Sequence, residues 1–390
     1  MALPTMTVRR IGLGTRAVAA AVTGWLLLAG GRVAAEPLPA SLTDAEFWRL
    51  VETLSEPDGY FDSDNLLSNE TTFQYVIPTL TTIVKPGTAY LGVGPEQNFT
   101  YIIALRPAVA FVPDIRRGNL HAHLMYKALF EMAADRAECL SLLFARRRPA
   151  GLGPGTGVNA LLDAYAAAPV DHALHARTLA AIKERLTVRH GFALRAADAA
   201  GVDYVYTAFR DAGPGLSYNS SRPQRRAYPT YSELQRETDD QGQLRGYLAS
   251  EANFRTLKSF EERNLLVPLV ADFAGPKTIR AVGAYLKAHE ATVGAFYTSN
   301  VENYLFQSGS WGRFAGNVAA LPLDAGSTFI RACFDSCGGA AGSRSTTLLD
   351  SMPDLLRDFD AGRIRSYWDV LSHSASGRAS GRPVGRPVVQ

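Results

Sequence analysis

Short apolar runs alternate with amphipathic stretches along most of the chain. Six runs of four to nine residues, bounded mainly by glycine, proline or acidic residues, predict buried strands. Longer stretches with apolar residues at helical spacing predict helices. The predicted strands are 89–93, 109–112, 202–206, 265–273, 292–298 and 326–332. The predicted helices are 44–54, 73–80, 95–106, 119–145, 158–188 and 276–289.

This alternation favours a parallel sheet, because parallel neighbours need a crossover connection that is usually helical. We therefore expect an α/β fold, with a doubly wound, mostly parallel sheet and helices on both faces. We find no internal repeat and no linker in the sequence, so we expect one domain with helical and loop inserts. Residues 211–231 have no periodicity and form a candidate lid.

The N-terminus has the layout of a secretory signal peptide. Arginines precede an apolar run over 17–31, and Val33-Ala34-Ala35 offers small residues for cleavage. The run is shorter than the ~20 residues that span a membrane. We predict a signal peptide over 1–35, a mature domain without a membrane span over 36–372, and a disordered tail over 373–390. The protein is then exported, periplasmic or secreted; a wrongly placed start codon would leave it cytoplasmic.

The charge of the chain gives no case for nucleic-acid binding. The formal net charge is +3, but Arg9, Arg10, Arg16 and Arg32 all lie in the leader, which has no acid. Without them, 36 basic residues stand against 37 acidic ones, a net charge of −1. We therefore expect a small-molecule ligand or substrate as the partner, and the sequence leaves the oligomeric state open.

Three cysteines are too few for a fold built on disulfides. Cys139 lies on a predicted helix, where we expect it in the core. Cys333 and Cys337 form a small disulfide if the protein is exported, or stay as free thiols.

Ligands of doubly wound sheets bind at the carboxyl ends of the strands. Two segments, at the ends of the first two predicted strands, are therefore candidates for a binding site. Gly92 and Gly94 let a ligand approach the backbone, although an ordinary tight turn would also need them. Glu96, in the first turn of the next helix, discourages a phosphate there. Asp114 follows Gly94 by twenty residues and ends the second strand, where an acid can accept both hydroxyls of a ribose. Its alternative role is a helix cap or an ion pair.

Two further segments end later strands. Asp272 lies at the end of the apolar strand 265–273 and is either a catalytic or amine-binding acid or the N-cap of the next helix. Residues 297–304, Tyr-Thr-Ser-Asn-Val-Glu-Asn-Tyr, place Asn300 and Glu302 at the end of another strand. A core would not need these polar side chains, so we expect them in a pocket.

Other patterns in the sequence are weaker indications of a binding or catalytic site. Asp58, Asp62 and Asp64 lack the glycine and terminal glutamate of a calcium loop, so they form a solvated turn or a flap over the ligand. A metal-dependent hydrolase using them is a third hypothesis, and we predict no metal site. His121 and His123 should point to different faces of their helix. The chain has neither a G-x-S-x-G nor a G-x-x-x-x-G-K-[ST] motif, which argues against a serine hydrolase and a P-loop ATPase.

The order of these segments, over roughly 89–331, resembles class I S-adenosylmethionine-dependent methyltransferases. Tyr90-Leu91-Gly92-Val93-Gly94 is similar to the first motif of that family, and Asp114 stands at the position of its ribose-binding acid. Asp272 falls where the fourth-strand motif of the family contributes to the active site. The chain departs from the family at Tyr90, where an acid is usual, and at Glu96, where a third glycine is usual. The segment also resembles an uncharacterised bacterial family.

The resemblance implies methyl transfer from S-adenosylmethionine to an unknown acceptor. The sulfonium of this cofactor carries its own activation, so the protein would mainly align the acceptor. Asp114 would hold the ribose, and Asp272 or Glu302 would orient or deprotonate the acceptor. The cofactor-binding candidates are Gly92, Gly94, Glu96, Asp114 and Asn300, and the catalytic candidates are Asp272 and Glu302.

Export conflicts with this function, because S-adenosylmethionine is a cytoplasmic metabolite. Either the leader is a start-site artefact, or the protein leaves folded with its cofactor bound, or the fold binds another ligand. The last case gives the alternative hypothesis of an exported, non-catalytic binding protein on a methyltransferase-like scaffold.

Overall fold

The computed structural model describes residues 37–218, 228–334 and 345–376. Within them a six-stranded sheet has the order β3-β2-β1-β4-β5-β6. The five strands β1 to β5 are parallel, and β6 runs antiparallel to β5 at one edge. This confirms the α/β, mostly parallel fold. The strands are β1 (Ala89–Gly92), β2 (Val109–Asp114), β3 (Leu266–Val270), β4 (Val293–Ser299), β5 (Leu323–Phe334) and β6 (Ser345–Ser351).

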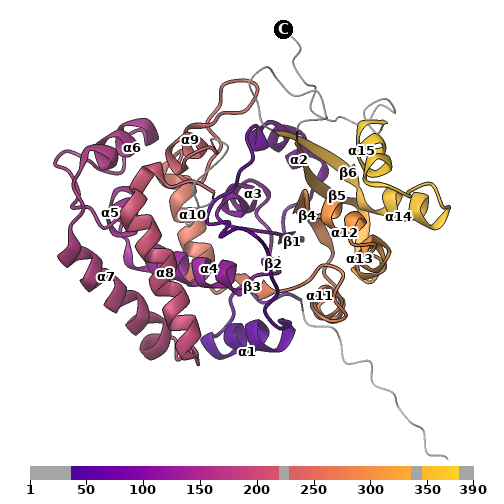
Figure 1. Cartoon of the computed structure of the whole chain (residues 1–390), viewed down its shortest axis with the longest axis horizontal. Helices are drawn as coiled ribbons and strands as arrows, with labels where there is room; N and C mark the ends of the chain where they lie inside the picture. The colour runs from indigo at the N-terminus through magenta and orange to yellow at the C-terminus, as the bar shows by residue number, and fades with distance from the viewer. Residues whose placement is uncertain (1–36, 219–227, 335–344, 377–390) are drawn as a thin grey trace, which may run out of the picture. The chain divides into compact units, whose positions relative to one another are not determined.

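Helices surround the sheet, which lies in the middle of Figure 1 between α4–α10 on one side and α11–α15 on the other. Right-handed crossovers put α3 and α4 on one face and α11 to α13 on the other, because the chain reverses direction across the sheet after β3. The first helices are α1 (Asp44–Leu54), η1 (Phe73–Val76), α2 (Ile77–Ile83), α3 (Gln97–Leu105) and α4 (Arg117–Met132). The insert before β3 comprises α5 (Arg136–Leu143), α6 (Val158–Ala167), α7 (His172–Glu184), η2 (Arg185–Arg189), α8 (Ala196–Ala212), η3 (Gly213–Gly215), α9 (Tyr231–Arg236) and α10 (Glu251–Glu262). The last helices are α11 (Thr278–Ala288), α12 (Val301–Gln307), α13 (Trp311–Val318), α14 (Met352–Asp360) and α15 (Tyr367–Ser376).

The strands β1, β2 and β3 are largely apolar because helices cover both faces of the sheet; β1 and β2 are internal, and β3 is an edge strand. Every residue of β1, β2 and β3 is buried. A parallel strand in this position needs a continuous apolar run rather than alternation. This explains why their sequences could be recognised as strands.

The predicted strand 202–206 is wrong, because these residues belong to the helix α8. The buried residues along it are Asp198, Val202, Val205, Tyr206 and Phe209, which have the spacing of one helix face. The Tyr206 hydroxyl donates to the Leu142 carbonyl at 2.6 Å. A short apolar run does not by itself distinguish a strand from one face of a helix, and here packing against the other helices decides.

Two long predicted helices are each divided by an aspartate that caps a new helix. The stretch 119–145 breaks after Met132, and the Asp135 side chain accepts the Glu138 N–H to start α5. The stretch 158–188 breaks after Ala167, and Asp171 accepts the Leu174 N–H to start α7. Aspartate favours such caps because its side chain binds the otherwise unpaired first N–H groups.

The ends of the chain are only partly described. The predicted leader lies outside the described residues, as do 377–390, whereas α15 continues to Ser376, beyond the predicted domain end at 372. None of the helices in the described ranges is long and apolar enough to span a membrane. Cys139 is buried on α5, as predicted, and Cys337 lies outside the described residues.

Candidate functional site

A cavity of about 410 Å³ lies at the carboxyl ends of β1 to β4. We call it the strand-end cavity. All four segments singled out from the sequence contribute to its wall. The strand ends supply Val93, Gly94, Asp114, Ala271, Asp272, Phe273, Ser299 and Asn300. The residues before η1 add Tyr60, Phe61, Asn65, Ser68, Asn69 and Glu70, and later segments add Tyr218 and Tyr304.

The turn after β1 is held open by a single asparagine. Asn98 Nδ2 donates to the carbonyls of Val93, Gly94 and Pro95 at 3.0, 3.0 and 2.8 Å. Gly94 has a φ of 82°, a conformation that favours glycine. A Cβ added there would meet only Asn65 Nδ2, at 4.0 Å. The turn therefore leaves free space beside the backbone, as a closely bound ligand requires.

Asp114 places a buried carboxylate next to this turn. Its Oδ1 accepts the backbone N–H of Arg116 at 2.8 Å, and the Arg116 Nε lies 3.7 Å from the same oxygen. Burial raises the pKa of Asp114 above its ordinary value, while the Arg116 guanidinium and backbone N–H groups oppose this rise. The carboxylate thus has a fixed orientation in a wall that it shares with Ile115.

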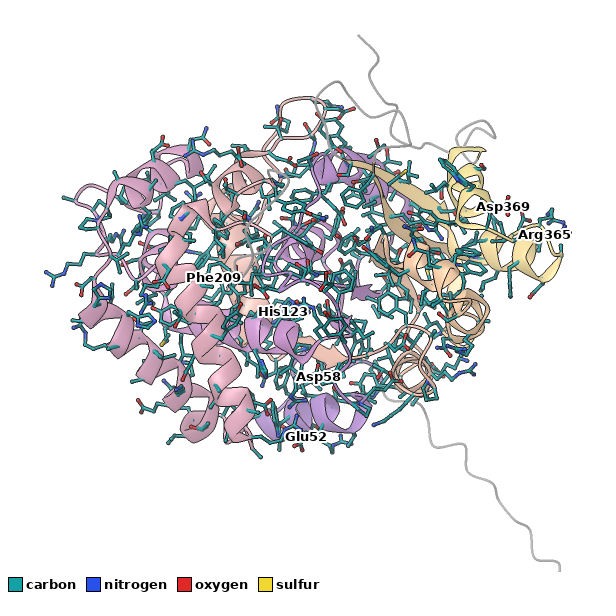
Figure 2. All side chains as sticks on the ribbon, in the orientation of Figure 1. Glu52, Asp58, His123, Phe209, Arg365 and Asp369 are labelled. Atoms are coloured by element: carbon teal, nitrogen blue, oxygen red, sulfur yellow. The ribbon has the colours of Figure 1, made fainter. Side chains whose placement is uncertain are left out.

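A flap made of residues 58–70 covers the cavity. Asp58 Oδ1 accepts the Arg117 N–H at 2.6 Å, and the Gly59 N–H donates to the Ile115 carbonyl at 2.8 Å (Asp58 is labelled in Figure 2). The Phe61 ring contacts the Tyr304 ring edge-on, with centroids 5.5 Å apart. The acidic loop therefore folds over the cavity as a flap, which is the second of the two arrangements expected for it, the first being a solvated turn. Among the described residues no group of three or more His, Cys, Asp or Glu side chains is placed to hold a metal ion.

Glu70, at the end of the flap, is a cavity residue that the sequence did not reveal. Its Oε1 accepts the Tyr297 hydroxyl at 2.7 Å and also the Ser299 hydroxyl. Its Oε2 accepts Gln97 Nε2 at 3.2 Å. Burial raises the pKa of Glu70, and these three hydrogen bonds oppose the rise. The only signal in the sequence is the polar run Ser68-Asn69-Glu70-Thr71 before an apolar helix.

A family model matches residues 66–154 and 157–351 of the chain, and it is described as a domain of unknown function, DUF7790. The chain belongs to the DUF7790 family. None of the curated proteins matches the chain. The matched DUF7790 region contains Glu70 and the ends of all four strands around the cavity, but it begins after Tyr60 and Phe61 of the flap.

In this DUF7790 chain Asp272 ends the third strand of the sheet rather than the fourth. The shift follows from the helix α8, which replaces the strand expected before it. Asp272 lines the cavity, and its Oδ1 accepts the Ala274 N–H at 2.9 Å. The first N–H groups of α11 instead bind Glu56, which accepts from Lys277 and Thr278 at 2.7 and 3.0 Å. The fourth-strand end is occupied by Ser299 and Asn300.

Glu302 is not part of the cavity wall, although Asn300 is. Its carboxylate is fully buried against Arg331 of β5, whose Nη2 lies 3.2 Å from Oε1. Arg331 also donates to Asp350 of β6 at 2.7 Å. This network joins α12 to two strands, so the Glu302 carboxylate lies in the core and not in the pocket where we expected it.

Gly92 and Glu96 also lie outside the cavity wall. A Cβ on Gly92 would lie 2.0 Å from Asn98 Oδ1 and 2.5 Å from the Tyr90 hydroxyl, so this glycine serves internal packing. Tyr90 donates to Asn98 Oδ1 at 2.8 Å and thereby supports the turn. Glu96 is buried, its Oε2 has no hydrogen-bond partner among the described residues, and burial raises its pKa to about 8.

The two histidines of α4 point to different partners, as expected. His121 Nε2 lies 3.0 Å from Asp198 Oδ1, and His123 Nε2 lies 3.0 Å from the Gly94 carbonyl (His123 is labelled in Figure 2). Burial lowers the pKa of His123 to about 4, so this ring is neutral near pH 7 and acts as a support for the turn.

Proposed function

We propose that the strand-end cavity binds S-adenosylmethionine and that the protein is a methyltransferase-like protein whose methyl acceptor is unknown. The observation that carries this proposal is the pairing of Asp114 with Gly94. A buried carboxylate at the end of β2 stands beside an open glycine turn at the end of β1. This arrangement suits a ribose, whose two hydroxyls need an acceptor beside a backbone that allows close approach.

The size and lining of the cavity fit such a cofactor. Its volume of about 410 Å³ falls in the range of ~300–1,000 Å³ that is usual for small-molecule sites. Ile115, Ala271 and Phe273 also line the wall and offer an apolar surface for a planar base. The Ala271 N–H donates to the Asp114 carbonyl at 2.7 Å, which fixes the ends of β2 and β3 together. When bound, S-adenosylmethionine supplies a methyl group activated by its sulfonium.

A thermal-unfolding experiment with S-adenosylhomocysteine tests the proposal. A ligand that binds only the folded state raises Tm, by several degrees when its concentration greatly exceeds Kd. We expect this shift for the wild-type chain and its loss in Asp114→Ala. The control is Asp163→Ala, an exposed acid of α6, which should keep the shift. No shift of the wild-type chain at millimolar ligand would contradict the proposal.

The exported, non-catalytic binding protein is the second candidate function. It is favoured by the positions of the two acids expected to be catalytic. The Glu302 carboxylate forms an ion pair with Arg331, and the Asp272 carboxylate accepts the Ala274 N–H in the turn after β3. Under this alternative S-adenosylhomocysteine gives no shift, and native mass spectrometry of the chain purified from its natural compartment finds a different small molecule bound.

A further inference from the structure

Glu70 is a buried carboxylate without a cationic partner. Within the described parts of the chain no Lys, Arg or His side chain forms an ion pair with it. Its three partners, Tyr297, Ser299 and Gln97, are all neutral donors. A buried carboxylate is costly unless a cation and hydrogen bonds compensate it. The described residues supply the hydrogen bonds but not the cation.

Other buried acids near the cavity differ from Glu70 in this respect. Asp114 has the guanidinium of Arg116 at 3.7 Å, and Glu302 has Arg331. Glu237 resembles Glu70, since burial raises its pKa to about 8 and its Oε2 accepts the Thr72 N–H at 3.1 Å. Glu237, however, does not line the cavity. Asp272 also lines the cavity, but it is only partly buried. Among the fully buried acids of the described residues, Glu70 is therefore the one in the cavity wall that has no ion pair.

We propose that Glu70 recognises an ammonium group of the ligand. Tyr297 and Ser299 already donate to Oε1 and Gln97 donates to Oε2, so the carboxylate is held in one orientation. A compact ammonium can add one hydrogen bond to such a carboxylate more readily than the two-pronged guanidinium can. This inference rests on the proposed function, because it takes the ligand of the cavity to carry an adenosyl group.

The ammonium has two sources. It is the amino group of the cofactor itself, or it belongs to an amine that enters beside the cofactor as the methyl acceptor. Tyr90 stands where the resemblance implies an acid, and its hydroxyl is engaged with Asn98, so no acid at that position competes with Glu70. Both sources require the same chemistry at Glu70, and two sets of titrations separate them.

The first set of titrations compares S-adenosylhomocysteine with 5′-methylthioadenosine, which has the same nucleoside and thioether but lacks the amino-acid chain with its ammonium and carboxylate. Isothermal titration uses the full wild-type chain, Glu70→Gln and the matched control Glu237→Gln. If the cofactor supplies the ammonium, Glu70→Gln lowers the affinity for S-adenosylhomocysteine at least tenfold and keeps the affinity for 5′-methylthioadenosine within twofold of the wild-type value. Glu237→Gln leaves both ligands within twofold.

The second set titrates protein saturated with S-adenosylhomocysteine with phenethylamine and with its neutral analogue 2-phenylethanol. If an acceptor supplies the ammonium, the wild-type chain binds the amine at least tenfold more tightly than the alcohol, and Glu70→Gln abolishes this preference. Either result supports the proposal and names the source.

The inference is overturned if Glu70→Gln matches the wild-type chain with both S-adenosylhomocysteine and phenethylamine. If the wild-type chain binds neither nucleoside, the proposed function fails and the inference fails with it. Thermal unfolding of each variant checks folding. Should Glu70→Gln not fold, Glu70→Asp replaces it, because this variant keeps the charge but shortens the side chain. A lower affinity for the amine-bearing ligand with an unchanged affinity for 5′-methylthioadenosine then supports the inference. Equal losses of affinity for both ligands overturn it.

Discussion

The carboxylate of Glu302 and the guanidinium of Arg331 form a fully buried ion pair between α12 and β5. Removing one partner of such a pair leaves the other charge poorly compensated. We expect Glu302→Gln to lower the free energy of unfolding by about 3 kcal/mol, measured by urea denaturation. Because Glu302 lies outside the strand-end cavity, the affinity for S-adenosylhomocysteine should not change.

The control for this variant is Gln307→Glu, on the exposed side of the same helix. Its free energy of unfolding should stay within about 0.5 kcal/mol of the wild-type value. A Glu302→Gln protein that is fully stable but has lost ligand affinity would return Glu302 to the functional residues.

Gly94 and Gly87 have the same φ of 82° but different surroundings. Alanine at either position is strained, so both Gly94→Ala and Gly87→Ala should lose about 1–2 kcal/mol of stability. Only at Gly94 does the new methyl group enter the strand-end cavity. We expect Gly94→Ala to lower the affinity for S-adenosylhomocysteine at least fivefold and Gly87→Ala to leave this affinity unchanged, as measured by isothermal titration. Equal affinities would mean that the ligand does not approach the turn.

Features that depend on neighbouring residues could be predicted from the sequence, whereas features that depend on contacts between distant residues could not. Asp114 and Asn300 could be predicted because each directly follows an apolar run, and parallel strands bring their carboxyl ends to one edge. Glu302 was expected in the same pocket, but it lies outside the cavity wall, although it is only two residues from Asn300. Asn300 is the N-cap of α12 and Glu302 lies in the first turn of this helix, where its side chain meets the core.

Glu70 could not be predicted because its partner Tyr297 lies 227 positions away. No local pattern marks it as a cavity residue, and only the packing of the flap on the sheet brings the two side chains together. The wrong strand at 202–206 had a further effect, since it moved Asp272 to the wrong place in the strand order. The helix–strand ambiguity of a five-residue apolar run thus became an error about which strand Asp272 follows.

Glu96 makes the stability of the folded protein depend on pH. Burial raises its pKa from 4.5 to about 8, and its Oε2 has no hydrogen-bond partner among the described residues. The folded state therefore keeps a proton on Glu96 between pH 4.5 and 8, whereas the unfolded state has lost it. Because the folded state binds more protons, the free energy of unfolding falls as the pH rises through this range, by at most roughly 5 kcal/mol from this group.

Glu96→Gln replaces the protonated carboxyl by a neutral group of the same shape. We expect its free energy of unfolding to equal the wild-type value near pH 4.5 and to exceed it by an increasing amount up to pH 8, in urea denaturation at matched ionic strength. Glu237 and Glu261 also have pKa values raised to about 8, so both proteins lose stability with pH, and only their difference reports Glu96. The control Glu52→Gln, at an exposed position of α1 labelled in Figure 2, should follow the wild-type curve. A constant difference between Glu96→Gln and wild type across this range would show that Glu96 is ionised in the folded protein and that a partner compensates its charge.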